Sequence, residues 1–315
     1  MKDIDVIVVG ELNVDLILNQ IGFFPEIGKE VLAQQMTLTL GSSSAIFASN
    51  LSSLGAKVSF IGKIGKDRFG EVVLKSLEEK GVDTSLIQQS AVSGTGATVV
   101  LNFNEDRSMV TYPGAMNDFC FDEIPLENLK RAKHLHFSSY FLQPGLKNEV
   151  GKLFRFAKES GLTTSLDTQW DPDEKWDLDM ADVLPYVDVF LPNEKEVYKL
   201  TQKESLPEAL KVLENNANTV IIKMGNKGSV SWHNGNLKHQ DSFFNHEVVD
   251  AIGAGDSFNA GFIYKFIHGH TVCDCQRFGN LIGAISTTKS GGTAAFKNYE
   301  QTMKIAQERF GYVHY

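Results

Sequence analysis

The chain has 315 residues and a formal net charge of −9, with 42% hydrophobic and 22% charged residues. This length favours one large α/β domain with an appendage. The acidic balance argues against a nucleic-acid-binding protein, which would present a basic face. Cys120, Cys273 and Cys275 are too few for a disulfide framework and suit a reducing compartment. Asp3 and Asp5 interrupt the first apolar run, so we expect no signal peptide or membrane anchor and a cytoplasmic location.

Six short apolar runs rich in β-branched residues predict strands that are buried on both faces. They cover residues 5–10, 57–65, 134–139, 162–167, 187–193 and 219–225. Amphipathic segments predict helices over residues 44–54, 69–80, 148–160, 195–201 and 206–215. Because strands alternate with helices, we expect a doubly wound, mostly parallel sheet with ligands beyond the carboxyl ends of its strands.

Two further segments, residues 12–41 and 95–116, alternate with period two and predict hairpins outside the main sheet. The second contains the turn residues Asn104, Glu105 and Asp106. We expect the two segments to pair as a small β-sheet lid over the strand ends. The lid would span about residues 11–40 and 94–115 of a single domain over 1–315. Its hydrophobic positions, among them Val99, Leu101 and Phe103, suggest the hypothesis of a homodimer through the lid.

The common nucleotide-binding loops are missing from the expected places. GFFPEIGKE, residues 22–30, has the wrong gap for a Walker loop, and Glu30 stands where a hydroxyl is needed. The dinucleotide fingerprint does not follow the first strand. Gly253 and Gly255 have its first spacing, but Phe258 occupies the third glycine position. The sequence therefore disfavours both a Walker-type phosphate loop and a dinucleotide-binding fold.

The stretch VVDAIGAGDSFNAGF, residues 248–262, places Gly253, Ala254 and Gly255 directly before Asp256 at the start of an expected helix. Taken alone, these residues leave two interpretations open. Asp256 could cap the helix. Alternatively, the three backbone amides could hold a phosphate while Asp256 accepts a proton from a substrate hydroxyl.

Residues 250–262 of this stretch resemble the C-terminal signature of the ribokinase-like, or PfkB-type, carbohydrate kinases. The resemblance extends along nearly the whole chain, and the combined motifs are highly specific. In order, the matching motifs are GELNVDLI (10–17), GSSSAIFASNLSSLG (41–55), IGKIGKDRFG (61–70), YPGAMND (112–118), LPNEKE (191–196) and IKMGNKGS (222–229). This resemblance implies a ribokinase-like α/β fold and ATP-dependent, Mg²⁺-assisted phosphorylation of a hydroxyl of a small sugar, with the primary hydroxyl expected.

The resemblance also implies roles for individual residues. Asp256 is similar to the catalytic base, and Gly253, Ala254 and Gly255 are similar to the anion hole for the transferred phosphoryl group. The substrate side corresponds to Asn13, Asp15, Gly41 and Ser42. The nucleotide side corresponds to Asn193, Glu196, Lys223, Gly225, Gly228 and Asn280. Glu196 would help to place Mg²⁺, partly through water.

Plainer interpretations of these residues remain open from the sequence. Asn193 could simply cap a surface helix after Pro192. Lys223 and Lys227 could both be solvated. Asn13 and Asp15 could belong to an ordinary turn after the first strand.

The chain departs from the family pattern at three places. Ser42 replaces the second glycine of the N-terminal signature, and Ile46 replaces a sugar-binding Asn, which weakens polyol binding unless Ser42 to Ser44 compensate. Asp250-Ala251-Ile252 replaces Asp-Thr-Thr, so a monovalent-cation site near Asp250 and activation by K⁺ are left open. The Arg that some sugar-acid kinases carry after the position of Asp167 is missing, which disfavours a carboxylated sugar.

The sequence therefore predicts a cytoplasmic carbohydrate kinase that acts on a small molecule, without a nucleic-acid or membrane partner. Three rival hypotheses remain. They are a nucleoside kinase of the same family, a catalytically silent sugar-binding regulator, and a dinucleotide-dependent oxidoreductase.

Overall fold

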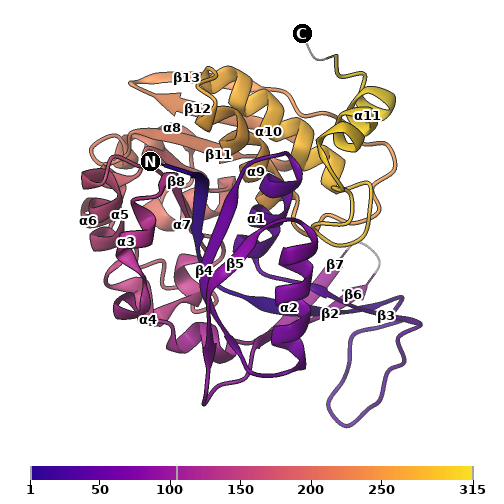
Figure 1. Ribbon diagram of the computed structural model, residues 1–315. Helices are drawn as coiled ribbons and strands as arrows, with labels where there is room; N and C mark the ends of the chain where they lie inside the picture. The colour runs from indigo at the N-terminus through magenta and orange to yellow at the C-terminus, as the bar shows by residue number, and fades with distance from the viewer. Residues whose placement is uncertain (1, 104–105, 314–315) are drawn as a thin grey trace.

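A nine-stranded central sheet forms the middle of the computed structural model, which describes residues 2–103 and 106–313 (Figure 1). Its strand order is β13-β12-β11-β10-β9-β8-β1-β4-β5, with parallel pairing from β11 to β5. The strands are β1 Ile4–Val9, β4 Val58–Gly65, β5 Asp83–Ser90, β8 Ala132–Ser138, β9 Thr163–Asp167, β10 Val189–Phe190, β11 Thr219–Lys223, β12 Ser229–His233 and β13 Asn236–Gln240. All six predicted strands are present, and the expectation of a mostly parallel sheet is confirmed.

Three strands of this sheet were not predicted, and one predicted strand is shorter. β5 lies at an edge and is only partly buried, so its sequence lacks the continuous apolar run of a central strand. β12 and β13 form an antiparallel hairpin around Asn234 and Gly235. Asn-Gly is a common hairpin turn, so the sequence did contain a signal for this pair that the strand predictions did not use. Of the strand predicted over residues 187–193, the sheet contains only β10.

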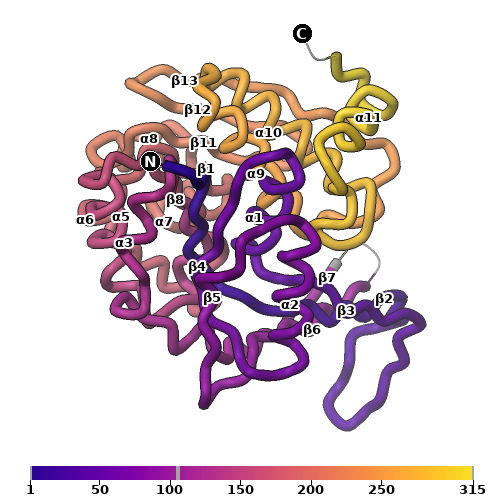
Figure 2. The backbone as a smooth tube through the Cα atoms, in the orientation of Figure 1, coloured from indigo at the N-terminus to yellow at the C-terminus, as the bar shows by residue number. Residues whose placement is uncertain are grey.

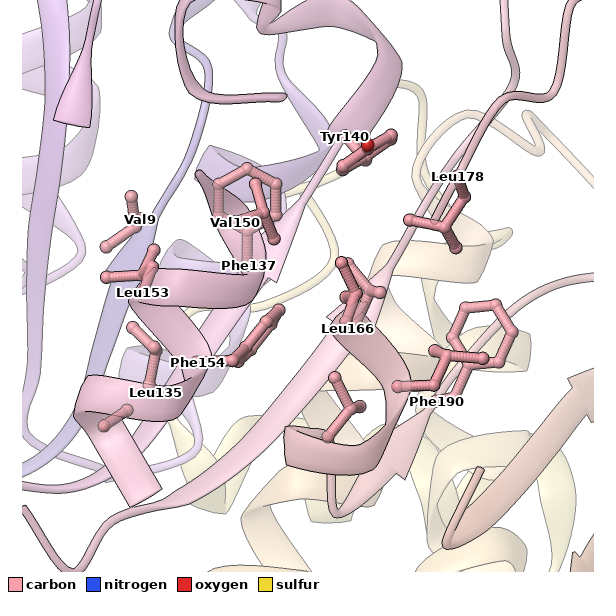
Figure 3. Packing of buried hydrophobic residues seen from close by; sticks show 14 of the residues in the cluster. Val9, Leu135, Phe137, Tyr140, Val150, Leu153, Phe154, Leu166, Leu178 and Phe190 are labelled. Carbon is pink, nitrogen blue, oxygen red and sulfur yellow. The ribbon is translucent and has the colours of Figure 1, made fainter. Parts of the chain in front are cut away.

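Helices cover both faces of the sheet. The side chains of β1 point alternately to the two faces, and those on each face are buried against helices. Val6 and Val8 pack with α1, α2 and α9, whereas Ile7 and Val9 pack with α5 and its neighbours. Figure 3 shows this second face, where Leu153 and Phe154 of α5 lie near Leu135 and Phe137 of β8.

The five helices predicted with bounds, which correspond to α1, α2, α5, α7 and α8, agree with the structure to within about two residues. On the first face and beyond its edge are α1 Ser43–Ser53, α2 Arg68–Glu79, α9 Ala254–Ile267, α10 Val272–Ser286 and α11 Tyr299–Phe310. On the second face are α3 Leu126–Leu129, α4 Pro144–Lys147, α5 Val150–Glu159, α6 Met180–Val183, α7 Glu194–Thr201 and α8 Leu206–Leu213. Short 3₁₀ helices occupy Gly114–Asp118, Phe121–Glu123, Tyr140–Leu142, Leu184–Tyr186 and Gly225–Lys227.

A separate four-stranded sheet, called here the small sheet, contains β2 Asn13–Asn19, β3 Gln35–Leu40, β6 Gly96–Phe103 and β7 Asp106–Tyr112. Its order is β3-β2-β6-β7, and β2 pairs with β6 in parallel, so the two segments do pair as expected. Figure 2 shows the long connection between β2 and β3 extending away from the body of the molecule. Asn104 and Glu105, two of the three residues of the expected turn, lie outside the described residues.

Candidate active site

Two adjoining cavities lie around the start of α9, and the larger one is the one bordered by the small sheet. The larger, of about 590 Å³, is lined by the small sheet, by the start of α1 and by Asp256. The smaller, of about 430 Å³, is lined by the turn after β11, by Phe243 and Phe244, and by α10. Both cavities are lined by Lys223, Gly225, Ala251, Ala254 and Gly255. Ala254 and Gly255 therefore lie at the junction between the two cavities, and the next residue, Asp256, lines the larger one.

The conformation at the start of α9 explains the glycine that precedes it. Gly253 has φ 71°, in the left-handed region that favours glycine. A Cβ atom on Gly253 would lie 2.7 Å from Cα of Gly292 and 3.1 Å from Cγ2 of Ile46. Helix α9 begins at the next residue, so the amides of Ala254 and Gly255 belong to its first turn, where an anion is favoured.

Asp256 is buried in that first turn, but it does not act as the helix cap. The N-cap position is Gly253, and Asp256 Oδ1 instead accepts a hydrogen bond from Nε2 of Gln169 at 2.9 Å. Burial raises the pKa of Asp256 to about 7, and the charge of Asp167 acts in the same direction. Lys223 and a hydrogen bond from Ser43 oppose this rise. A carboxyl group with a pKa near neutrality is suited to accept a proton from a hydroxyl.

Gln169 connects Asp256 to a buried network that the sequence analysis did not predict. Lys223 Nζ lies 2.5 Å from Asp167 Oδ2, and Asn259 Nδ2 donates to the same oxygen at 2.5 Å. Lys223 is therefore not solvated, whereas Lys227 is exposed and lies 4.0 Å from Glu194. The position of Asp167 at the carboxyl end of β9 indicated that it could lie near a ligand. Nothing in the local sequence indicated that Asn259, on α9, would contact it.

Asn193 and Glu196 form a capping box at the start of α7. Asn193 Oδ1 accepts from the Glu196 amide at 2.9 Å, and the Glu196 carboxylate accepts from the Asn193 amide at 2.8 Å. The capping interpretation of Asn193 is thus confirmed, yet both residues also line the larger cavity. Burial raises the pKa of Glu196 to about 7, with Asp167 adding to the rise and Lys223 opposing it.

The acidic groups around this cavity fit a divalent cation held mainly through water. Glu196, Asp256 and Asp167 are buried close to one another and next to the mostly buried Lys223, so additional positive charge would stabilise the ionised forms of these acids. Within residues 2–103 and 106–313, no cluster of three His, Cys, Asp or Glu side chains forms a metal cage. Mg²⁺ keeps several of its waters and needs few protein ligands, so Glu196 would suffice as an anchor.

On the small-sheet side, Asn13 and Asp15 face the larger cavity from β2. Asn13 Nδ2 donates to Asp15 Oδ1 at 3.1 Å and to Thr98 Oγ1 at 3.0 Å. Burial raises the pKa of Asp15 to about 6, opposed by the bond from Asn13 and the charge of Arg107. Gly41 lies behind them, because a Cβ atom there would lie 2.3 Å from Asp15 Oδ1. The Gly41 amide donates to the Asn13 carbonyl, so Gly41 supplies room for these side chains.

In the serine run after Gly41, Ser42 and Ser44 make hydrogen bonds inside the protein. Ser42 has φ 68°, the left-handed conformation that explains why a glycine is expected there. Its hydroxyl donates to the Glu11 carbonyl at 2.6 Å and accepts from the Ala45 amide at 2.9 Å. Ser44 donates its hydroxyl and its amide to the Glu11 carboxylate. Glu11, a cavity residue that the sequence analysis missed, is fully buried, and burial raises its pKa.

Ile46 is 3% exposed and packs between the two glycine turns at the cavity floor. Its methyl groups occupy the space beside Gly253 and Gly292, where a Cβ atom on Gly292 would lie 2.6 Å from Ile46 Cδ1. On the next turn of α1, Asn50 Nδ2 donates to Ser257 Oγ and to the Gly292 carbonyl, each at 2.9 Å. Helix α1 therefore holds the start of α9 by packing at Ile46 and by hydrogen bonds at Asn50.

The smaller cavity contains the residues expected on the nucleotide side. Gly225 has φ 59°, and Gly228 has φ 88° with the Gln240 carbonyl 2.1 Å from where a Cβ atom would be. Asn280 Nδ2 donates to the carbonyls of Gln240 and Asp241 at 3.2 and 3.1 Å. These residues line a space with mostly apolar walls, which suits a flat heterocycle.

Asp250 links the segment before α9 to the turn at residues 290–292. Its Oδ1 accepts from the Ile252 amide at 2.9 Å, and its Oδ2 accepts from the Gly291 amide at 3.0 Å and from Ser290 Oγ at 3.3 Å. The carboxylate is thus engaged by three donors. A role for Asp250 beside a monovalent cation stays a prediction.

Comparisons with known proteins agree with this geometry. The family model described as "pfkB family carbohydrate kinase" matches residues 3–298. An uncharacterized sugar kinase of Archaeoglobus fulgidus is 30% identical over 243 residues, covering 76% of this chain and 95% of that protein. A ribokinase of Lactococcus lactis is 27% identical over 291 residues, covering 90% and 91%.

Among solved structures, an Arabidopsis thaliana ribokinase complexed with ribose and ATP has a TM-score of 0.81 at 22% identity, covering 96% of this chain and 98% of that one. This similarity confirms the ribokinase-like α/β fold. No helix within residues 2–103 and 106–313 is long and apolar enough to span a membrane. The chain therefore belongs to the pfkB family of carbohydrate kinases, and it is a sugar kinase of the ribokinase and fructokinase type.

Proposed function

We propose that the protein transfers the γ-phosphoryl group of ATP to a hydroxyl, expected to be primary, of a small sugar bound in the larger cavity. The supporting observation is the position of Asp256, which lies in the first turn of α9 where the two cavities meet. One cavity offers carboxylate and amide groups suited to hydroxyls, and the other offers glycine turns and apolar walls suited to a nucleotide.

In this proposal the sugar is held by Asn13 and Asp15. Asn13 is oriented by its bond to Thr98, and Asn13 in turn donates to Asp15. Asp256 orients the reacting hydroxyl and accepts its proton as the oxygen attacks phosphorus. The amides of Gly253, Ala254 and Gly255 bind the negative charge that develops on the transferred group. Mg²⁺, anchored by Glu196 partly through water, would neutralise the charge of the ATP phosphates.

Lys223 contributes a positive charge to the site in this scheme. Burial alone would lower the pKa of Lys223, but the charges of Asp167 and Glu196 outweigh it and raise that pKa, so the side chain remains an ammonium. It lines both cavities, next to the Gly-Ala-Gly stretch. We infer that its positive charge lies close to the path of the phosphoryl group. Gly225, Gly228 and Asn280 would support the nucleotide on the other side.

A coupled ADP-release assay tests this function. The panel would contain pentoses, ketohexoses, deoxy-keto-sugar acids and nucleosides, each with Mg-ATP. We expect turnover with a neutral sugar. Preference for a nucleoside would replace the substrate assignment, and sugar binding without ADP release for every acceptor would favour a silent regulator. A parallel series with Na⁺ and K⁺ salts tests whether turnover depends on a monovalent cation, as a site near Asp250 would require.

We also propose that the small sheet acts as a lid and that two copies pair through its outer face. Asp15 and Val100 are buried toward the cavity, whereas the alternate residues form an apolar row on the other face. That row contains Leu38, Leu16, Val99 and Val110, which are paired in register across the four strands. Leu38 and Val110 are 41% and 69% exposed, so pairing would remove apolar surface from water.

Sedimentation equilibrium at micromolar concentration checks this second proposal. We expect a dimer for the unmodified protein and a monomer for Val110→Lys. A monomer at every concentration for the unmodified protein would contradict it.

A further inference from the structure

Gln169 lies between two acidic side chains at the floor of the larger cavity. Its Nε2 is 3.0 Å from Asp167 Oδ2 and 2.9 Å from Asp256 Oδ1. A side-chain amide nitrogen carries two hydrogens, so Nε2 can donate one to each carboxylate. The reverse amide orientation would place an oxygen against two carboxylates, which fixes the orientation chemically.

The backbone at Gln169 is held in an unusual conformation. Its φ is 58°, a left-handed value that costs a residue with a side chain about 1 kcal/mol or more. The following loop is well built, since Asp171 Oδ2 accepts from the Trp176 amide at 2.6 Å. The rings of Trp170 and Trp176 also pack edge to face at 4.9 Å. The fold therefore maintains a strained residue at the point where its side chain reaches Asp256.

Several charged groups face Asp256 from different elements. Asp167 at the end of β9 and Glu11 after β1 add negative charge, and Lys223 at the end of β11 adds positive charge. Glu196 on α7 is near enough for its own pKa to be affected by Asp256. Among these neighbours, Gln169 is uncharged and contacts both Asp167 and Asp256 directly.

We propose that Gln169 is a positioning residue for the phosphoryl-transfer reaction, because its amide binds Oδ1 of Asp256 and so fixes the orientation of the carboxylate toward the acceptor hydroxyl. The bond also favours the ionised form of Asp256, which is the form that accepts a proton. At the same time, the amide separates two carboxylates that would otherwise repel each other. This inference rests on the proposed role of Asp256 as the base.

The test compares Gln169→Met, which keeps the length of the side chain but lacks the donor, with the matched control Gln88→Met. Gln88 is on β5, away from the cavities, and donates to the Glu123 carbonyl. Two properties would be measured for each variant. One is the pH profile of kcat/KM, and the other is the titration of Asp256 by carboxyl ¹³C NMR, assigned by its loss in Asp256→Asn.

For Gln169→Met we expect both the acidic limb of the profile and the NMR midpoint of Asp256 to move up by about one pH unit. Activity lost near pH 7 would then be partly regained near pH 9. Gln88→Met should leave both curves unchanged. If Gln169→Met does not fold, Gln169→Glu replaces it, and the added carboxylate should raise the Asp256 midpoint further.

Unchanged profiles and an unchanged Asp256 midpoint in a folded Gln169 variant would overturn the inference. The NMR titration needs no substrate, so it tests Gln169 even if no sugar is phosphorylated. An upward shift of the Asp256 midpoint with no activity on any acceptor would support the contact with Gln169 while rejecting the proposed function.

Discussion

Lys223 Nζ lies 2.5 Å from Asp167 Oδ2, and the two side chains are 11% and 0% exposed. This pair links the ends of β11 and β9, and the charges of both groups act on Asp256. Because the charges are buried, each is stable only in the presence of the other. The pair therefore contributes both to the stability of the fold at the carboxyl ends of these strands and to the charge environment of Asp256.

Removing one member of the pair should be strongly destabilising. Lys223→Met leaves Asp167 buried without its cation, and we expect a loss of about 3–5 kcal/mol in the free energy of unfolding. Urea denaturation measures this loss. The double variant Asp167→Asn, Lys223→Met should recover a large part of it, since no charge then remains unpaired. Equal losses in the single and double variants would argue against the paired arrangement.

The raised pKa of Asp256 makes a prediction about stability. An acid with a folded-state pKa of about 7 and an ordinary unfolded value binds more protons when folded, so stability falls as pH rises from about 4 to 7. Asp256→Asn removes this charge and keeps an oxygen acceptor for Gln169. We expect the variant to be more stable than the unmodified protein at pH 8, by roughly 1–3 kcal/mol.

Thermal unfolding across pH provides the measurement. The stability difference should shrink as pH falls and vanish only below about pH 4, where Asp256 is protonated in the unfolded protein as well as in the folded one. A variant that is less stable at pH 8 would show that the ionised carboxylate is well compensated in the folded protein.

Ile46 should affect turnover through packing. Ile46→Ala opens a space beside Gly253 and Gly292, with an expected loss of about 2–4 kcal/mol in stability. Because the Gly253 turn would then be less well held, we expect kcat to fall more than the acceptor KM rises. Ile7→Ala, a matched change on the other face of the sheet, should lower stability similarly and leave kcat unchanged. Equal kinetic effects of the two changes would contradict a local role for Ile46.

The sequence predicted those features that depend on local pattern. The buried runs of the central strands, the period-two segments of the small sheet and the turn at Gly253 each carry a signal within a few residues. The missing parts depend on contacts between distant segments. Gln169 meets Asp256 across 87 positions, and Asn50 meets Gly292 across 242. Glu11 was overlooked because a carboxylate after a strand is usually solvated, and only the fold shows that Ser44 covers it.

Ser42 shows a different limit of sequence reasoning. Its replacement of a glycine suggested a hydroxyl available to a ligand. In the fold, that hydroxyl caps α1 and contacts the Glu11 carbonyl, while the backbone keeps the conformation a glycine would have adopted. A substitution within a motif can therefore preserve the backbone and direct the new side chain into the protein.

The most direct test of the central claim, that Asp256 is the base of a sugar kinase, is single-turnover ADP release by Asp256→Asn. The assay uses the best acceptor from the panel, and calorimetry measures acceptor binding by the same variant. We expect the rate to fall by several orders of magnitude while sugar affinity is largely kept, because the amide cannot accept the proton. Near-normal ADP release by a folded Asp256→Asn variant would contradict the account.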